Sequence, residues 1–136
     1  VKLLNVSEEY IKSEVDYQIA EINRRLMTYR GTTQPPDISG REVILVDDGI
    51  ATGYTIRAAA ISLRKLNAKR IILAVPVAPP DSLHMMSSFV DETYCLKSPW
   101  PFMAVGYWYK EFHHVSDDEV LHLLKKAKEI EYQHKQ

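Results

Sequence analysis

Cysteine is almost absent from this sequence of 136 residues: Cys95 stands alone, so no disulfide forms within the chain. A lone thiol suits a reducing compartment and no secretory signal is visible, so we expect a cytoplasmic protein. Long apolar runs are also absent, because Pro76, Pro79 and Pro80 interrupt stretches that are already shorter than the roughly 20 residues needed to span a bilayer. We therefore expect no membrane partner.

Charge of one sign is not in excess either. Lys and Arg total 17 against 18 Asp and Glu, which gives a net charge of −1. This balance offers no global electrostatic reason to expect a nucleic acid as partner. His113 and His114 are adjacent, but no Cys or carboxylate pattern accompanies them, so we do not expect a metal site there.

The most informative stretch is Val43–Thr55, which reads VILVDDGIATGYT. Its leading apolar residues predict a strand, and their unbroken apolarity indicates burial on both faces, as in a parallel sheet between helices. Asp47 and Asp48 follow at the carboxyl end of that strand, where ligands of open α/β sheets bind. A loop of small residues containing Gly49 and Gly53 then leads into a helix.

The loop and the two carboxylates favour different chemical groups, which one ligand can carry at its two ends. Small loop side chains leave successive backbone N–H groups free to converge on an anion at the start of a helix, and Thr52 and Thr55 add hydroxyl donors. Adjacent carboxylates repel a phosphate but suit sugar hydroxyls or Mg²⁺, which prefers oxygen ligands. The pattern therefore predicts a site for a phosphorylated sugar.

Two other interpretations of the acidic pair stay open. The carboxylates cap the next helix, or they resemble the acidic pocket of a receiver domain. A receiver requires a third acidic residue at a later strand end, whereas the strand predicted at Ile71–Ala78 ends in Pro-Val-Ala.

The stretch Val43–Thr55 resembles the phosphoribosyl-pyrophosphate (PRPP) signature of type I phosphoribosyltransferases. Further similarity to a prokaryotic group of predicted phosphoribosyltransferases runs through Tyr29–Gly31, Ala74–Ala78, Ala104–Gly106, and Phe112 with Val115–Val120. The resemblance implies that Asp47 and Asp48 contact the ribose hydroxyls. It also implies that PRPP is held by the loop residues Gly49, Ile50, Ala51, Thr52, Gly53, Tyr54 and Thr55.

The implied reaction displaces pyrophosphate from ribose C1 by an unknown nitrogenous acceptor. In that role Asp47 and Asp48 are the catalytic residues: they orient the ribose, stabilise positive charge on its ring and hold Mg²⁺, directly or through water. Ala51 stands where hypoxanthine-guanine enzymes carry an acidic residue, so a 6-oxopurine acceptor is not supported; adenine and orotate enzymes tolerate a non-acidic residue there. The alternative function is a non-catalytic PRPP- or nucleotide-binding module for regulation or assembly.

We expect a single α/β domain with the Rossmann-like parallel sheet of the type I phosphoribosyltransferase fold. A long helix at about 7–30 begins at the N-cap Ser7, a PRPP-motif core follows at about 41–97, and an aromatic segment with a terminal helix occupies about 98–136. We interpret the aromatic segment mainly as core cover. Trp100 and Phe102 are its best candidates for stacking on a planar acceptor.

Type I enzymes carry a strand with a pyrophosphate-binding loop, and a flexible catalytic loop, before the PRPP motif. Here 42 residues precede Val43, and most of them are predicted to form one helix. We therefore expect a fold without the amino-terminal strands and an unpaired sheet edge at Arg41–Asp47. Such an edge predicts a homo-oligomer or association with the missing amino-terminal segment.

Overall fold

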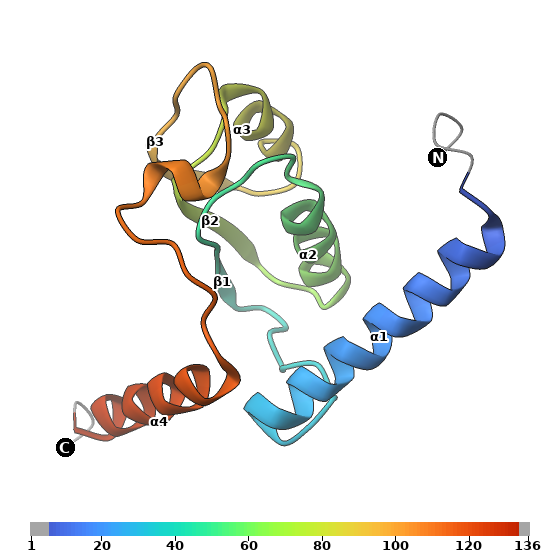
Figure 1. Cartoon of the computed structure of the whole chain (residues 1–136). Coiled ribbons are helices and arrows are strands. Elements are labelled where there is room, and N and C mark those ends of the chain that lie inside the picture. Colours follow the sequence, from blue (N-terminus) through green and yellow to red (C-terminus); the bar gives the residue numbers. More distant parts are fainter. Residues whose placement is uncertain (1–5, 134–136) are drawn as a thin grey trace. The chain divides into compact units, whose positions relative to one another are not determined.

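The computed structural model describes residues 6–133, and side chains up to residue 130. Positions 134–136 of the predicted terminal segment lie outside the described residues. Two compact units are present, Val1–Pro35 with His114–Gln136 and Pro36–His113 (Figure 1). That the chain forms one domain stays a prediction.

The unit Pro36–His113 contains a parallel three-stranded sheet in the order β1-β2-β3. Its elements are β1 (Glu42–Val46), α2 (Tyr54–Lys65), β2 (Arg70–Val77), α3 (Pro80–Met86), β3 (Glu92–Lys97) and the short 3-10 helix η1 (Val105–Trp108). In the register, Val46 lies opposite Ala74, which lies opposite Tyr94. β1 and β2 fall where the sequence predicts strands, and the α/β fold class is confirmed.

The core occupies one face of this sheet. Ile71 and Leu73 of β2 are completely buried there, together with Ala60 of α2 and Met86 of α3. Because the strands follow one another in chain order, successive right-handed crossovers place both helices on the same face (Figure 1).

The prediction that the motif strand is buried on both faces is wrong for this unit. Val43 and Leu45 pack against the core, but Ile44 and Val46, on the other face, are 64% and 68% exposed. The reason is the arrangement of α2 and α3, which cover only one face within the described residues of the unit. As expected, β1 lies at an edge of the three-stranded sheet.

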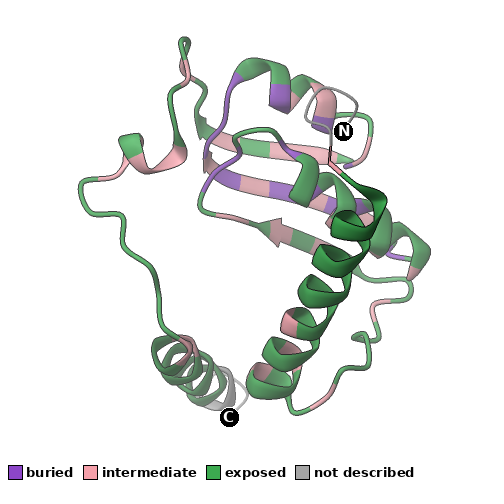
Figure 2. Ribbon diagram, turned by 45° about the vertical axis from the view of Figure 1, so that its right-hand side comes forward, coloured by how far each residue is buried: buried purple, intermediate pink, exposed green. Residues whose placement is uncertain are grey.

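The second unit contains α1 (Glu8–Arg30) and α4 (Asp117–Gln133). Ser7 caps α1, since its hydroxyl accepts a hydrogen bond from the Tyr10 N–H at 3.2 Å, as predicted. Asp117 accepts hydrogen bonds from Arg24, at 2.7 Å, and from the hydroxyl of Tyr29, which joins the two helices. Helix α1 contains no buried residue, and Figure 2 shows it exposed along most of its length.

Candidate functional site

The loop after β1 is fixed from two sides by residues distant in sequence. The Ile50 N–H donates to the carbonyl oxygen of Val77 at the end of β2, at 2.9 Å. The Ser82 hydroxyl, buried on α3, donates to the carbonyl oxygen of Ala51 at 2.7 Å. These bonds place the loop at the carboxyl ends of β1 and β2, where the sequence predicts a site.

Two glycines are required by the path of this loop. A Cβ atom on Gly49 would lie 2.7 Å from Val105 Cγ1 and 2.9 Å from Val77 Cγ1, so no larger residue fits without a shift. Gly53 has φ +78°, a left-handed conformation that favours glycine, and it precedes α2. No side chain caps α2, so N–H groups of its first turn remain available to an anion.

A pocket of about 130 Å³ lies over the loop. Its lining consists of Asp47, Gly49, Ile50, Ala51, Thr52, Gly53, Thr55 and Ile56. The structure thus brings one predicted carboxylate together with most of the predicted phosphate loop, while Asp48 and Tyr54 do not line the pocket. This volume is below the roughly 300–1,000 Å³ of pockets that enclose whole small molecules, so it suits one group of a ligand.

The acidic pair carries two close negative charges. The Asp48 N–H donates to the Asp47 carboxylate at 3.0 Å. Partial burial raises the pKa of Asp48, and the negative charge of Asp47 raises it further, while a hydrogen bond from the Gly49 N–H acts in the opposite direction. Within residues 6–130 neither carboxylate forms an ion pair, so both remain available to a cation or to hydroxyl groups.

The donor set of this pair fits Mg²⁺. Mg²⁺ is commonly held by one or two carboxylates together with waters and substrate phosphates. Asp47 and Asp48 supply two such oxygen-bearing groups, and the described side chains contain no cluster of three or more His, Cys, Asp or Glu that would form a complete protein cage.

Tyr109 is a site residue that the sequence analysis did not single out. Its hydroxyl donates to the carbonyl oxygen of Asp48 at 2.5 Å, and its ring packs on Phe112 with 5.2 Å between ring centroids. No local sequence signal distinguishes Tyr109 from the neighbouring aromatic residues, because the contact joins residues 61 positions apart.

The two predicted stacking residues are not brought to the loop pocket. Trp100 is 76% exposed, Phe102 is half-buried, and neither lines the pocket. Trp108 is half-buried instead, with the Lys97 ammonium 4.6 Å from its ring centroid. Both the core-covering interpretation of the aromatic segment and acceptor stacking by Trp100 and Phe102 stay predictions.

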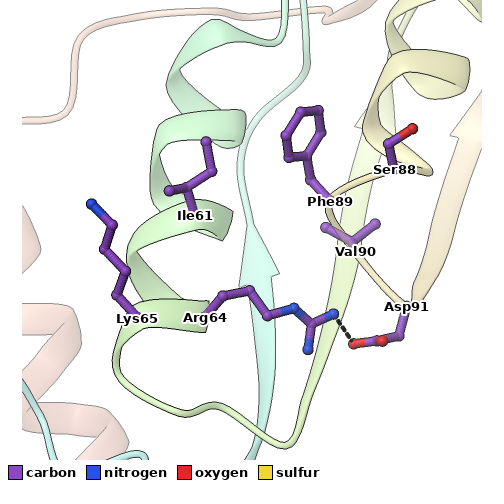
Figure 3. A pocket seen from close by; sticks show the side chains of 7 residues that line it. All are labelled: Ile61, Arg64, Lys65, Ser88, Phe89, Val90 and Asp91. Atoms are coloured by element: carbon purple, nitrogen blue, oxygen red, sulfur yellow. Dashed lines mark hydrogen bonds and ion pairs between the residues drawn. The ribbon is translucent and has the colours of Figure 1, made fainter.

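A second, larger pocket of about 530 Å³ lies at the other end of the strands (Figure 3). In it, Asp91 accepts hydrogen bonds from Arg64 of α2 at 2.5 Å and from the Ile71 N–H at 2.7 Å. These bonds tie α2 and the residue before β3 to the beginning of β2. Arg64 and Asp91 of this pocket thus have a structural role, away from the acidic pair.

A family model described as the phosphoribosyl transferase domain matches residues 5–111. The chain belongs to this family. A Mycobacterium tuberculosis protein named "Putative phosphoribosyl transferase" is 40% identical over 110 residues, which cover 81% of this chain and 25% of that protein. The resemblance drawn from the motif is thereby confirmed.

Other similar proteins match to different extents. The crystal structure of TT1426 from Thermus thermophilus has a TM-score of 0.73 and 33% identity, covering 88% of this chain and 57% of that one. Uracil phosphoribosyltransferase of Lactobacillus gasseri is 49% identical over 49 residues, 36% of this chain and 23% of that protein. The chain thus spans about a quarter of the length of the curated relatives. No described helix is long and apolar enough to cross a bilayer.

Proposed function

We propose that Asp47, Asp48 and the loop Gly49–Thr55 bind the ribose 5-phosphate part of PRPP. The whole protein then transfers the phosphoribosyl group to a nitrogenous acceptor and releases pyrophosphate. The observation that carries the proposal is the loop pocket, where a carboxylate lies beside the uncapped amino terminus of α2. Membership of the phosphoribosyl transferase family supports the same reaction class.

Each part of the site has a separate task in this reaction. The loop amides and the hydroxyls of Thr52 and Thr55 hold the 5-phosphate, because they supply donors without adding negative charge. Asp47 and Asp48 accept hydrogen bonds from the ribose hydroxyls and stabilise the positive charge that develops on the ring as the C1–O bond to pyrophosphate breaks. Mg²⁺ bound at the pair supplies charge neutralisation of the leaving pyrophosphate.

The acceptor is proposed only as a nitrogenous nucleophile. Ala51 lines the pocket with a methyl group, which transfers no proton, so the loop itself offers no acid to a purine acceptor. The similarity to the uracil enzyme covers about a third of this chain, so we do not propose uracil as the acceptor on that ground.

The Gly53→Val variant tests the phosphate site. Gly53 has φ +78°, a left-handed conformation that a β-branched residue adopts only with strain, so valine is expected to change the backbone that faces the phosphate, while the Met85 Cε methyl, 2.7 Å from a Cβ there, can move aside. Titration calorimetry with ribose 5-phosphate is expected to show binding to the unaltered chain and at least about a tenfold weaker affinity in the variant, the effect of losing one or two charge-assisted hydrogen bonds.

Gly40→Val is the matched control. Gly40 has nearly the same conformation, φ +72°, but a Cβ there meets nothing within 4 Å, and it lies before β1 rather than in the loop. It therefore imposes the same backbone strain without touching the site, and ribose 5-phosphate affinity should be unchanged. Undiminished binding by a folded Gly53→Val chain would rule out the loop as the phosphate site.

A further inference from the structure

We propose that Tyr109 is a positioning residue for the acidic pair: its hydroxyl fixes the peptide between Asp48 and Gly49 and thereby the direction of the Asp48 carboxylate. Its effect on PRPP binding rests on the proposed function. The contact that carries the proposal is the hydrogen bond from the Tyr109 hydroxyl to the Asp48 carbonyl oxygen, 2.5 Å long.

Both ends of this peptide are engaged. Its carbonyl oxygen accepts from Tyr109, and its other end is the backbone of Gly49, on which Val105 packs. A peptide group is planar, so a donor that holds the oxygen also sets where the N–H points. The Tyr109 hydroxyl therefore fixes the backbone from which the Asp48 side chain projects, without touching the carboxylate itself.

The segment that carries Tyr109 contacts the same turn at a second point. Val105, at the beginning of η1, lies so close to Gly49 that a Cβ there would be 2.7 Å from its Cγ1. Val105 and Tyr109 stand at the two ends of η1, so the segment is held against the turn at two positions. Two contacts fix an orientation that one contact leaves free to rotate.

Tyr109 is itself held in place. Its N–H donates to the Gly106 carbonyl oxygen at 3.3 Å, and its ring packs on Phe112. The Phe112 ring lies directly over Gly106, where a Cβ would come within 2.8 Å of it. The hydroxyl is thus presented by a packed turn, which makes it suitable for holding another group.

Tyr109→Phe is the test, because it keeps the ring and removes only the hydroxyl. Tyr107→Phe is the control: Tyr107 lies in η1, its side chain is 73% exposed, and its ring packs on Trp108 at 5.7 Å. Amide hydrogen exchange is expected to accelerate at Gly49 and Ile50 in Tyr109→Phe but not in Tyr107→Phe. With Mg²⁺ present, calorimetry should show PRPP affinity weakened by roughly 3–10-fold, the usual effect of one neutral hydrogen bond.

The outcomes separate this inference from the proposed function. Faster exchange confined to the turn supports the positioning role even if the unaltered chain binds no PRPP, a result that would sink the proposed function alone. Unchanged exchange at Gly49 and Ile50 overturns the inference. Exchange that accelerates uniformly through the sheet, with a matching fall in melting temperature, also overturns it, since that pattern marks a purely structural tyrosine.

Discussion

Replacing Gly49 with alanine measures how closely η1 packs on the turn that carries the acidic pair. The new Cβ would lie 2.7 Å and 3.0 Å from the two Cγ atoms of Val105 and 2.9 Å from Val77 Cγ1. Unstrained carbon contacts are about 3.5–4.0 Å, so at least one neighbour must move by roughly 0.8 Å. Overpacking of this kind costs about 1–3 kcal/mol. In a unit of this size each kcal/mol lowers the melting temperature by about 4–8 °C.

A double-mutant cycle assigns this cost to its source. Val105→Ala removes two of the three close contacts, so the loss of stability in the double variant should be smaller than the sum of the single losses by about 1 kcal/mol or more. Thermal melts followed by circular dichroism measure all four proteins. A Gly49→Ala chain that melts within about 2 °C of the unaltered one would refute the close packing. Strictly additive losses would refute its attribution to Val105.

Two other variants, one double and one single, test the charges of the unit. Replacing both Asp47 and Asp48 with asparagine keeps the side-chain volume but removes two like charges. In PRPP titrations the dependence of PRPP affinity on Mg²⁺ should vanish, while the melting temperature stays unchanged. A large fall in melting temperature with intact PRPP affinity would contradict the functional role. The Ile71 N–H, and then Arg64, lower the pKa of Asp91, so its contribution to stability is present above the unfolded pKa of about 3.9 and is lost as the pH falls through the lower folded value. Urea unfolding measured between about pH 6 and pH 3 should therefore show that the free energy of unfolding falls more steeply with decreasing pH in the unaltered chain than in Asp91→Asn. An identical pH dependence in the two proteins would argue against the Asp91 contacts.

The parts of the structure that follow from sequence are those with local signals. Ser116 and Glu119 have the local spacing of a capping box and form one before α4, with the Ser116 N–H 2.8 Å from the Glu119 carboxylate and the Glu119 N–H 3.3 Å from the Ser116 hydroxyl. The acidic pair follows the predicted strand for the same reason, since apolar residues, carboxylates and glycines are consecutive. The bonds of Ser82 and Tyr109 to this turn carry no such signal. They join residues 31 and 61 positions apart and depend on how the chain returns over the sheet.

The apolar pattern of β1 correctly predicts a strand, but the expectation that both faces of this strand are buried is wrong for this unit. Unbroken apolarity indicates a strand covered on both faces, yet sequential right-handed crossovers supply helices to one face only. Ile44 and Val46 on the open face are joined by Tyr94 and Leu96 of β3, which are 58% and 88% exposed. The open face leaves apolar side chains for a cover from outside this three-stranded unit, and the expected homo-oligomer or amino-terminal segment stays a prediction. The acidic pair directly follows β1, and Tyr109 bonds to the carbonyl oxygen of Asp48, so any cover that fixes β1 also acts on the backbone that leads into the site.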